Sequence, residues 1–202
     1  MHAMAEQTNK EKYLNGNFLL QYFLRQFIKT ISQTAEECRP ATILDVGCGE
    51  GFVATAVAKR LPDASLRALD ISPAAIEYAR SHNTSKNLSY EVLDLFSLAK
   101  EPEHYDLVIC NEVLEHLNDY DSALKLLCQK AKKTVIISVP NEPYFRLANF
   151  CRLRYMSRLG NHPEHVNCWS RKQITALAAQ YGRVNAVKKL LFWTVVQFTP
   201  QA

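Results

Sequence analysis

The chain has 202 residues, of which 48% are hydrophobic and 22% are charged, and its net charge is +4. This length is most simply one globular domain with a buried core, and the charge is too small to indicate a class of partner. We expect neither a membrane span nor a secretory signal, since no apolar run is long enough and the N-terminal residues are polar. The six cysteines are scattered without a C-x-x-C pair, which predicts free thiols and a cytoplasmic location.

Strand and helix patterns alternate along the chain. Apolar residues at helical spacing predict an amphipathic helix from Phe18 to Ile31, before the first strand. The elements expected after it are, in order, a strand at Thr42–Val46, a helix at Phe52–Leu61, a strand at Ser65–Leu69, a helix from Pro73 to about His82, strands at Leu88–Val92 and Asp106–Cys110 separated by a loop, a helix at Asp119–Ala131, a strand at Thr134–Val139, a helix at Ser170–Tyr181, and strands at Val184–Lys189 and Phe192–Phe198. This alternation predicts an α/β fold with a mostly parallel sheet covered by helices on both faces.

A glycine-rich turn joins the first predicted strand to the helix that follows it. Gly47, Gly49 and Gly51 form G-x-G-x-G directly after Asp45, and such a turn lets backbone approach a nucleotide closely. Dinucleotide folds instead use G-x-G-x-x-G and place a pyrophosphate at the helix N-terminus. The Asp45 carboxylate would repel a pyrophosphate but suits a ligand with an ammonium group. S-adenosylmethionine (SAM) is such a ligand, because it carries an ammonium, a sulfonium and a nucleoside but no phosphate.

Two segments carry a family resemblance. The string ILDVGCGEG, from Ile43 to Gly51, resembles the first signature motif of the class I SAM-dependent methyltransferases. The string YDLVICNEVLEHL, from Tyr105 to Leu117, is similar to VLEHL strings of small-molecule and lipid methyltransferases of that class, including those of the ubiquinone pathway. The resemblance implies a Rossmann-like fold with a seven-stranded, mostly parallel sheet and an antiparallel last strand. The resemblance covers nearly all of the chain from about Thr42. With the helix expected before it, we expect one methyltransferase domain over residues 1–202, in which residues 1–40 are an N-terminal helical segment.

The predicted cofactor residues lie at strand ends. Asp70 ends the second strand, where a carboxylate can accept both hydroxyl hydrogens of a ribose; the alternative role, a helix N-cap, suits Ser72 better. Asp94 is either a turn aspartate or, as the resemblance implies, the acceptor for the adenine amino group. The full predicted cofactor set is Asp45, Gly47, Cys48, Gly49, Gly51, Asp70, Ile71, Asp94, Leu95 and Asn111.

Glu112, Glu115 and His116 fall at positions i, i+3 and i+4, so they share one face if the segment is helical. Carboxylates with an imidazole can bind Mg²⁺, Mn²⁺ or Zn²⁺. The resemblance implies the same, because ubiquinone-pathway O-methyltransferases and small-RNA 2′-O-methyltransferases use E-x-x-E-H as a metal site. The RNA enzymes add a later histidine, for which His165 is the candidate. Alternatively, the glutamates are ordinary polar residues and His116 is a catalytic base or a core histidine.

The segment from Pro140 to Ser170 interleaves aromatic and basic residues after a strand end. Open α/β sheets bind ligands at that edge, so residues 140–170 are expected to form a substrate cap. The alternative is a solvated basic helix. His165 and Trp169 have the spacing of the RNA enzymes' H-x-D-H-x-x-x-W pattern, but Asn167 and Cys168 replace its Phe-Glu pair.

Methyl transfer to oxygen needs alignment of the two partners and a base or a metal for the acceptor. His116 is the first candidate base and His165 the second. Oxygen is favoured over nitrogen, because NEPY at Asn141 follows the fifth predicted strand and not the fourth, where amino-group methyltransferases carry N-P-P-Y. Carbon stays open as the acceptor atom.

Three functions remain open at this stage. The first is O-methylation of a phenolic, quinone-like, sugar or lipid-linked small molecule. The second is RNA 2′-O-methylation, which the short and only mildly basic chain disfavours. The third belongs to another class: a SAM-binding module without catalysis, or a nicotinamide-dependent oxidoreductase, which the missing G-x-G-x-x-G argues against.

Overall fold

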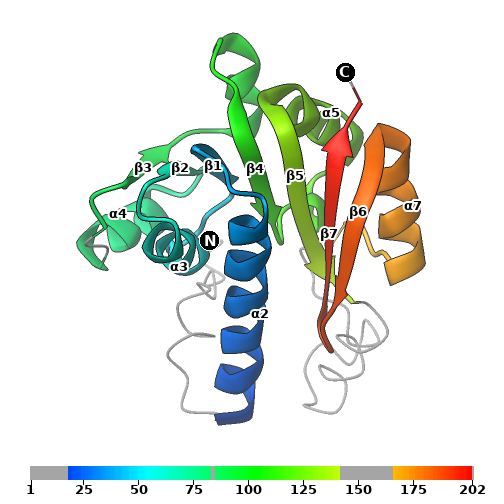
Figure 1. The fold of residues 1–202 in the computed structure, drawn as a ribbon, viewed down its shortest axis with the longest axis horizontal. Coiled ribbons are helices and arrows are strands. Elements are labelled where there is room, and N and C mark those ends of the chain that lie inside the picture. Colours follow the sequence, from blue (N-terminus) through cyan, green and yellow to red (C-terminus); the bar gives the residue numbers. More distant parts are fainter. Residues whose placement is uncertain (1–17, 83–84, 142–165, 202) are drawn as a thin grey trace, which may run out of the picture.

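The structure is a computed structural model that describes residues 18–82, 85–141 and 166–201. Within these residues, seven strands form one sheet in the order β3-β2-β1-β4-β5-β7-β6 (Figure 1). Strands β1 to β5 pair in parallel, and β7 is antiparallel to both β5 and β6. This confirms the predicted mostly parallel sheet with an antiparallel last strand.

The observed elements follow the predicted order closely. The strands are β1 (Thr42–Val46), β2 (Ser65–Asp70), β3 (Leu88–Val92), β4 (Tyr105–Asn111), β5 (Ala131–Pro140), β6 (Gly182–Lys189) and β7 (Trp193–Pro200). The α-helices are α2 (Phe18–Glu37), α3 (Phe52–Arg60), α4 (Pro73–His82), α5 (Tyr120–Lys130) and α7 (Arg171–Tyr181), and two 3₁₀ helices are η1 (Leu95–Lys100) and η2 (Leu114–His116).

Two differences from the prediction have local causes. The first helix continues from Ile31 to Glu37, because its buried face extends through Thr34 and Ala35. The expected loop after β3 contains η1, which begins where the Asp94 side chain accepts a hydrogen bond from the backbone N–H of Phe96. A short polar cap is enough to start a 3₁₀ turn.

Alternate residues of the central strands point to opposite faces of the sheet, and both faces are buried. Ile43, Ile109 and Ile136 pack on one face with apolar residues of α2, α3 and α4. Leu44, Val108 and other residues of opposite parity pack on the second face with α5 and α7. Both faces are therefore covered, as a parallel sheet requires. The strand order runs in opposite directions from β1 toward β2 and toward β4, and this switch point is where open α/β sheets form a ligand crevice.

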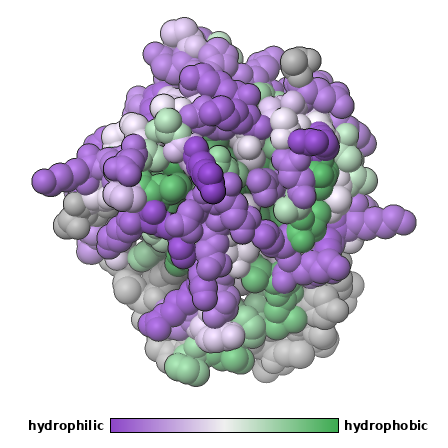
Figure 2. Space-filling view, in the orientation of Figure 1, coloured by the Kyte–Doolittle hydropathy of each residue, from purple (hydrophilic) through white to green (hydrophobic). Residues whose placement is uncertain are grey.

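Helix α2 stands at the edge of this core (Figure 1). Its first turns expose Phe18, Leu19 and Tyr22, whereas Phe27 and Ile31 are buried. Figure 2 shows hydrophilic side chains over the upper part of this face and apolar side chains gathered toward its lower part. In the part of the chain that the structure describes, no helix is both long and apolar enough to cross a membrane.

Candidate active site

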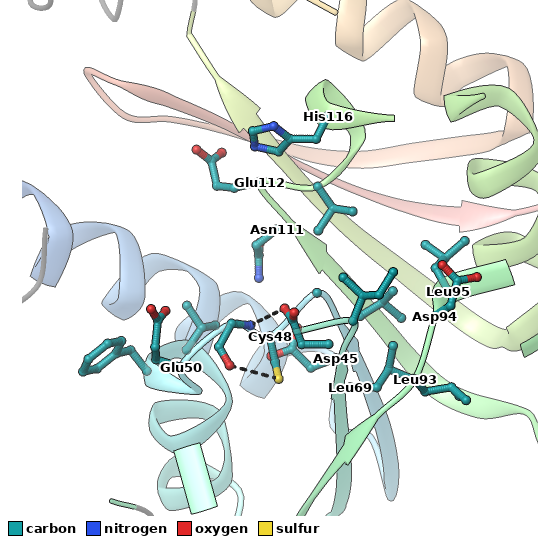
Figure 3. A pocket seen from close by; sticks show the side chains of 18 of the residues that line it. Asp45, Cys48, Glu50, Leu69, Leu93, Asp94, Leu95, Asn111, Glu112 and His116 are labelled. Atoms are coloured by element: carbon teal, nitrogen blue, oxygen red, sulfur yellow. Dashed lines mark hydrogen bonds between the residues drawn. The ribbon is translucent and has the colours of Figure 1, made fainter. Parts of the chain in front are cut away.

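A cavity of about 350 Å³ lies at the carboxyl ends of β1, β2 and β4 (Figure 3). It brings together most of the predicted cofactor residues, namely Asp45, Gly47, Cys48, Gly49, Asp70, Ile71, Asp94, Leu95 and Asn111. Gly51 lies just behind it, as the residue that precedes α3. Glu112 and His116 also line this cavity, at the end away from Asp94 (Figure 3).

The glycine turn has a backbone that other residues rarely adopt. Gly47, Gly49 and Gly51 have φ angles of 74°, 53° and 79°, in the left-handed region that favours glycine. A Cβ atom on Gly47 would also stand 2.2 Å from Cγ2 of Val113, which is too close for any side chain. The backbone N–H groups of Gly47 and Cys48 donate to the carbonyl of Leu69, at 2.8 and 3.0 Å. The turn is therefore fixed between the ends of β2 and β4.

Asp70 holds the same turn from β2. Its Oδ2 atom accepts from the Gly49 backbone N–H at 2.8 Å, and its Oδ1 atom accepts from the Ser72 N–H at 2.8 Å. Ser72 caps α4, because its Oγ accepts from the Ala75 N–H at 3.3 Å. The cap alternative is thus filled by Ser72. Each carboxylate oxygen can accept a second hydrogen bond, so the geometry of Asp70 is compatible with ribose binding.

Asp45 is a buried carboxylate inside the cavity. It is 1% exposed, and its Oδ2 atom has no hydrogen-bond partner among the described residues. Burial, together with the charge of Asp70, raises the pKa of Asp45 from 3.8 to about 7. Burial and the Asp45 charge likewise raise the pKa of the Cys48 thiol well above its usual value. Cys48 is therefore a neutral thiol, and a cation beside Asp45 would favour its charged form.

Asn111 ends β4 and contributes a second buried polar group. It is 8% exposed, and neither Oδ1 nor Nδ2 has a partner in the described part of the chain. A buried amide without hydrogen bonds costs about 1–3 kcal/mol. Such a group facing a cavity indicates a ligand that offers both a donor and an acceptor.

At the opposite end of the cavity, Asp94 takes the turn role that the sequence offered. Its Oδ1 accepts from the Phe96 N–H at 2.9 Å and so begins η1. The residue also lines the cavity beside Leu95. A carboxylate accepts about four hydrogen bonds, so this cap leaves capacity for a ligand.

The prediction that Glu112, Glu115 and His116 share a helical face is wrong. Glu112 lies outside any helix with φ 56°, in the bend after β4, where its N–H donates to the Ser138 carbonyl of β5. Only Leu114–His116 is helical, as a 3₁₀ turn. Glu115 is 1% exposed and does not line the cavity, whereas Glu112 and His116 do. Over residues 18–82, 85–141 and 166–201, no group of three His, Cys, Asp or Glu side chains could hold a metal ion.

The end of the predicted substrate cap is anchored beside His116. Val166 and Asn167 donate their backbone N–H groups to the Glu115 carbonyl, at 2.9 and 3.0 Å. The Asn167 side-chain amide donates to the carbonyls of Leu114 and Leu117, at 3.3 and 2.6 Å. His165 and most of the cap, residues 142–165, lie outside the described residues.

Sequence reasoning missed Phe27 and Trp193. Phe27 of α2 lines the cavity, and its ring lies 4.9 Å from that of Trp193 at the start of β7. The Trp193 Nε1–H donates to Oε2 of Glu112 at 2.9 Å. The one signal in the sequence was the helical spacing that made Phe27 a core residue; nothing local connects Trp193 to Glu112. An N-terminal helix and a C-terminal strand therefore help to build this end of the cavity.

The fold and the cavity together define a class I methyltransferase fold. A family model described as "Methyltransferase domain" matches residues 18–185, and the chain belongs to this family. This confirms the methyltransferase class that the signature strings predicted. Among solved structures, magnesium protoporphyrin IX methyltransferase (ChlM) from Synechocystis PCC 6803 with bound SAH superposes with a TM-score of 0.71. The match covers 95% of this chain and 92% of that one at 16% identity, which supports the fold.

Curated relatives share the central part of the chain. Malonyl-[acyl-carrier protein] O-methyltransferase of Acetivibrio thermocellus is 38% identical over 96 residues, which are 48% of this chain and 34% of that protein. Ubiquinone biosynthesis O-methyltransferase of Coxiella burnetii is 34% identical over 85 residues, which are 41% of this chain and 36% of that protein. The matched region thus spans about a third of the length of these relatives.

Proposed function

We propose that this protein transfers a methyl group from SAM to a hydroxyl oxygen of a small molecule. The observation that carries the proposal is the cavity in which Asp45 and Asn111 are buried with polar atoms that lack partners among the described residues. The methionine portion of SAM offers an ammonium for the carboxylate, and hydrogen-bond donors and acceptors for the amide. No phosphate is required, which agrees with a carboxylate in this position.

The proposed binding mode assigns residues of the cavity to each part of SAM. Asp45, Asn111 and the backbone of Gly47, Cys48 and Gly49 receive the methionine portion, with Gly51 behind them. Asp70 receives the ribose hydroxyls, and Asp94 with the Leu95 N–H receives the adenine. Ile71 is 69% exposed at the cavity rim, where an apolar side chain can cover the adenosine.

Oxygen is the proposed acceptor atom. Both relatives carry O-methyltransferase in their names, and His116 lines the cavity at the end away from Asp94. A neutral imidazole there can take the proton of an acceptor hydroxyl as its oxygen attacks the methyl carbon. When bound, SAM supplies an activated methyl group and leaves as S-adenosylhomocysteine (SAH). The acceptor is proposed to be phenolic, quinone-like, sugar or lipid-linked, and His165 stays the second candidate base.

We also propose that a divalent metal binds at the acceptor end. It would have fewer protein ligands than the E-x-x-E-H motif implied. Glu112 and His116 line the cavity and supply one carboxylate and one imidazole. Glu115 is buried away from the cavity, so the three-residue set does not fit. The test is turnover after exhaustive treatment with EDTA. Loss of turnover that Mg²⁺, Mn²⁺ or Zn²⁺ restores supports the metal, and full turnover refutes it.

The organisation of the chain is proposed to follow its family. Residues 1–202 form one domain, in which residues 1–40 are an N-terminal helical segment and residues 140–170 cap the acceptor. The anchoring of Val166 and Asn167 beside His116 supports a cap at this place. In the described part of the chain Cys38, Cys48, Cys110 and Cys128 are free thiols, which supports a cytoplasmic location.

The experiment that tests this function uses SAM with a labelled methyl group. The full chain is incubated with a catechol, a hydroquinone, a sugar alcohol and a small RNA in separate reactions, and label transfer is measured by mass spectrometry. Transfer to a small-molecule hydroxyl supports the proposal. Transfer to RNA alone, or SAH binding without any transfer, contradicts it. His116→Asn should lower the rate about 10²- to 10⁴-fold, whereas His104→Asn, outside the cavity lining, is the matched control.

A further inference from the structure

Tyr90 lies on β3 outside the cavity lining, yet its hydroxyl reaches the glycine turn. The residue is 8% exposed. Its hydroxyl donates to the Gly51 carbonyl at 3.3 Å and lies 3.0 Å from Oγ1 of Thr55, in the first turn of α3. One side chain thus connects β3, the end of the turn and the start of the helix.

The direction of these hydrogen bonds follows from the number of hydrogens. Burial raises the pKa of Tyr90 to about 12, so its hydroxyl keeps its single hydrogen at neutral pH. That hydrogen goes to the Gly51 carbonyl, and Thr55 must then donate to the Tyr90 oxygen. The Thr55 backbone N–H also donates to the Gly51 carbonyl at 2.9 Å. This carbonyl is therefore held from two sides.

Gly51 and Tyr90 depend on each other. Gly51 has φ 79°, and a Cβ atom there would lie 2.3 Å from the Tyr90 hydroxyl oxygen. Any larger residue would push Tyr90 away as well as straining the backbone. The middle of the turn has a separate anchor, because the Gly49 N–H donates to Asp70. Asp70 lines the cavity, whereas Tyr90 holds the turn from behind.

We propose that Tyr90 is a positioning residue for SAM binding. By fixing the Gly51 carbonyl, it keeps the backbone of Gly47–Gly49 in the geometry that receives the methionine portion of the cofactor. Thr55 acts through Tyr90 and not on the ligand. Without the hydroxyl, the end of the turn is held less firmly, and binding has to order it. The inference rests on the proposed function, since it needs the cavity to bind SAM or SAH.

The test compares two tyrosines whose hydroxyls are both hydrogen-bonded. Tyr90→Phe removes the anchor of the turn. Tyr105→Phe is the matched control, because its hydroxyl accepts from Arg67 at 3.1 Å at the start of β4, away from the cavity. Calorimetry with SAH should show affinity about five- to tenfold weaker for Tyr90→Phe, the scale of one lost hydrogen bond. Tyr105→Phe should keep the affinity of the unsubstituted chain, although both variants unfold at a lower temperature.

Two further measurements separate positioning from general stability. Thr55→Val should also weaken SAH binding, and the double variant should bind no worse than Tyr90→Phe alone, because both act through one hydrogen-bond chain. Hydrogen exchange of the Gly47–Gly51 amides should be faster in free Tyr90→Phe and slow again with SAH. Unchanged SAH affinity in Tyr90→Phe, or an equal loss in Tyr105→Phe, overturns the inference. Failure of the unsubstituted chain to bind SAH instead refutes the proposed function.

Discussion

Replacing Asp45 with asparagine should stabilise the free protein at neutral and alkaline pH while weakening its binding of SAH. The carboxylate is 1% exposed and stands near Asp70, and its pKa is raised from 3.8 to about 7. Because the folded state holds a proton that the unfolded state has already released, the free energy of unfolding falls as the pH rises from about 4 to 7. At 1.36 kcal/mol per pKa unit, the full loss above pH 7 is about 4 kcal/mol. The asparagine side chain cannot ionise, so the variant should escape this loss.

The pH has the opposite effect on ligand binding. An ammonium beside Asp45 favours the carboxylate, so SAH should bind more tightly as the pH rises to about 7. Below pH 7, the SAH affinity should change by up to about tenfold per pH unit. Asp45→Asn should bind SAH weakly and without this dependence. The same residue therefore destabilises the free fold and stabilises the complex, a common trade at binding sites.

The assay is urea unfolding of both proteins at pH 5, 6, 7 and 8, with and without SAH. Asp106→Asn is the control, because the hydrogen bond from Lys133 and those from the backbone of Ala41 and Thr42 lower the pKa of Asp106. That variant should lose stability at neutral pH and approach the unsubstituted chain as the pH falls. An Asp45→Asn protein that is less stable than the unsubstituted chain at pH 8 without ligand would refute the reasoning.

Three further substitutions test individual contacts. Asp70→Ala removes an acceptor of the Gly49 N–H and the proposed ribose ligand, so calorimetry should show SAH binding weaker by about 2 kcal/mol or more; unchanged affinity would leave Asp70 a structural residue. Trp193→Phe keeps the ring against Phe27 but removes the donor to Glu112, so methyl transfer should slow while SAH affinity stays within about twofold. Asn111→Leu should raise the unfolding temperature of the free protein and weaken SAH binding, as expected for a buried amide that only a ligand satisfies; the opposite changes would count against that role.

The cofactor end of the cavity could be predicted because its chemistry is local. Gly47, Gly49 and Gly51 follow directly after β1, and their spacing indicates a turn with positive φ angles, which favours glycine. Asp70 ends β2 and Asp94 follows β3, and parallel strands bring their carboxyl ends to one edge. The pattern of apolar residues therefore predicted both the sheet and the place of these side chains.

The turn after β4 could not be predicted from spacing alone. Glu112, Glu115 and His116 have helical periodicity, but the Glu112 N–H donates to the Ser138 carbonyl of β5 and holds that residue in a bend after β4. The competing hydrogen bond comes from a strand 26 residues later, so no local pattern reveals it. Trp193 is farther still from Glu112, at 81 positions.

The two ends of the cavity are thus assembled in different ways, and this bears on what the family resemblance can say. The proposed cofactor end consists of the backbone of one turn and of carboxylates at strand ends. The acceptor end joins Phe27, Glu112 and Trp193 from widely separated parts of the chain, and Asn167 is fastened beside it. Changes in any of these segments can reshape the acceptor end without disturbing the glycine turn. We therefore expect α2, β7 and the residues before α7 to determine which acceptor binds, and those are the segments to vary when acceptors are screened.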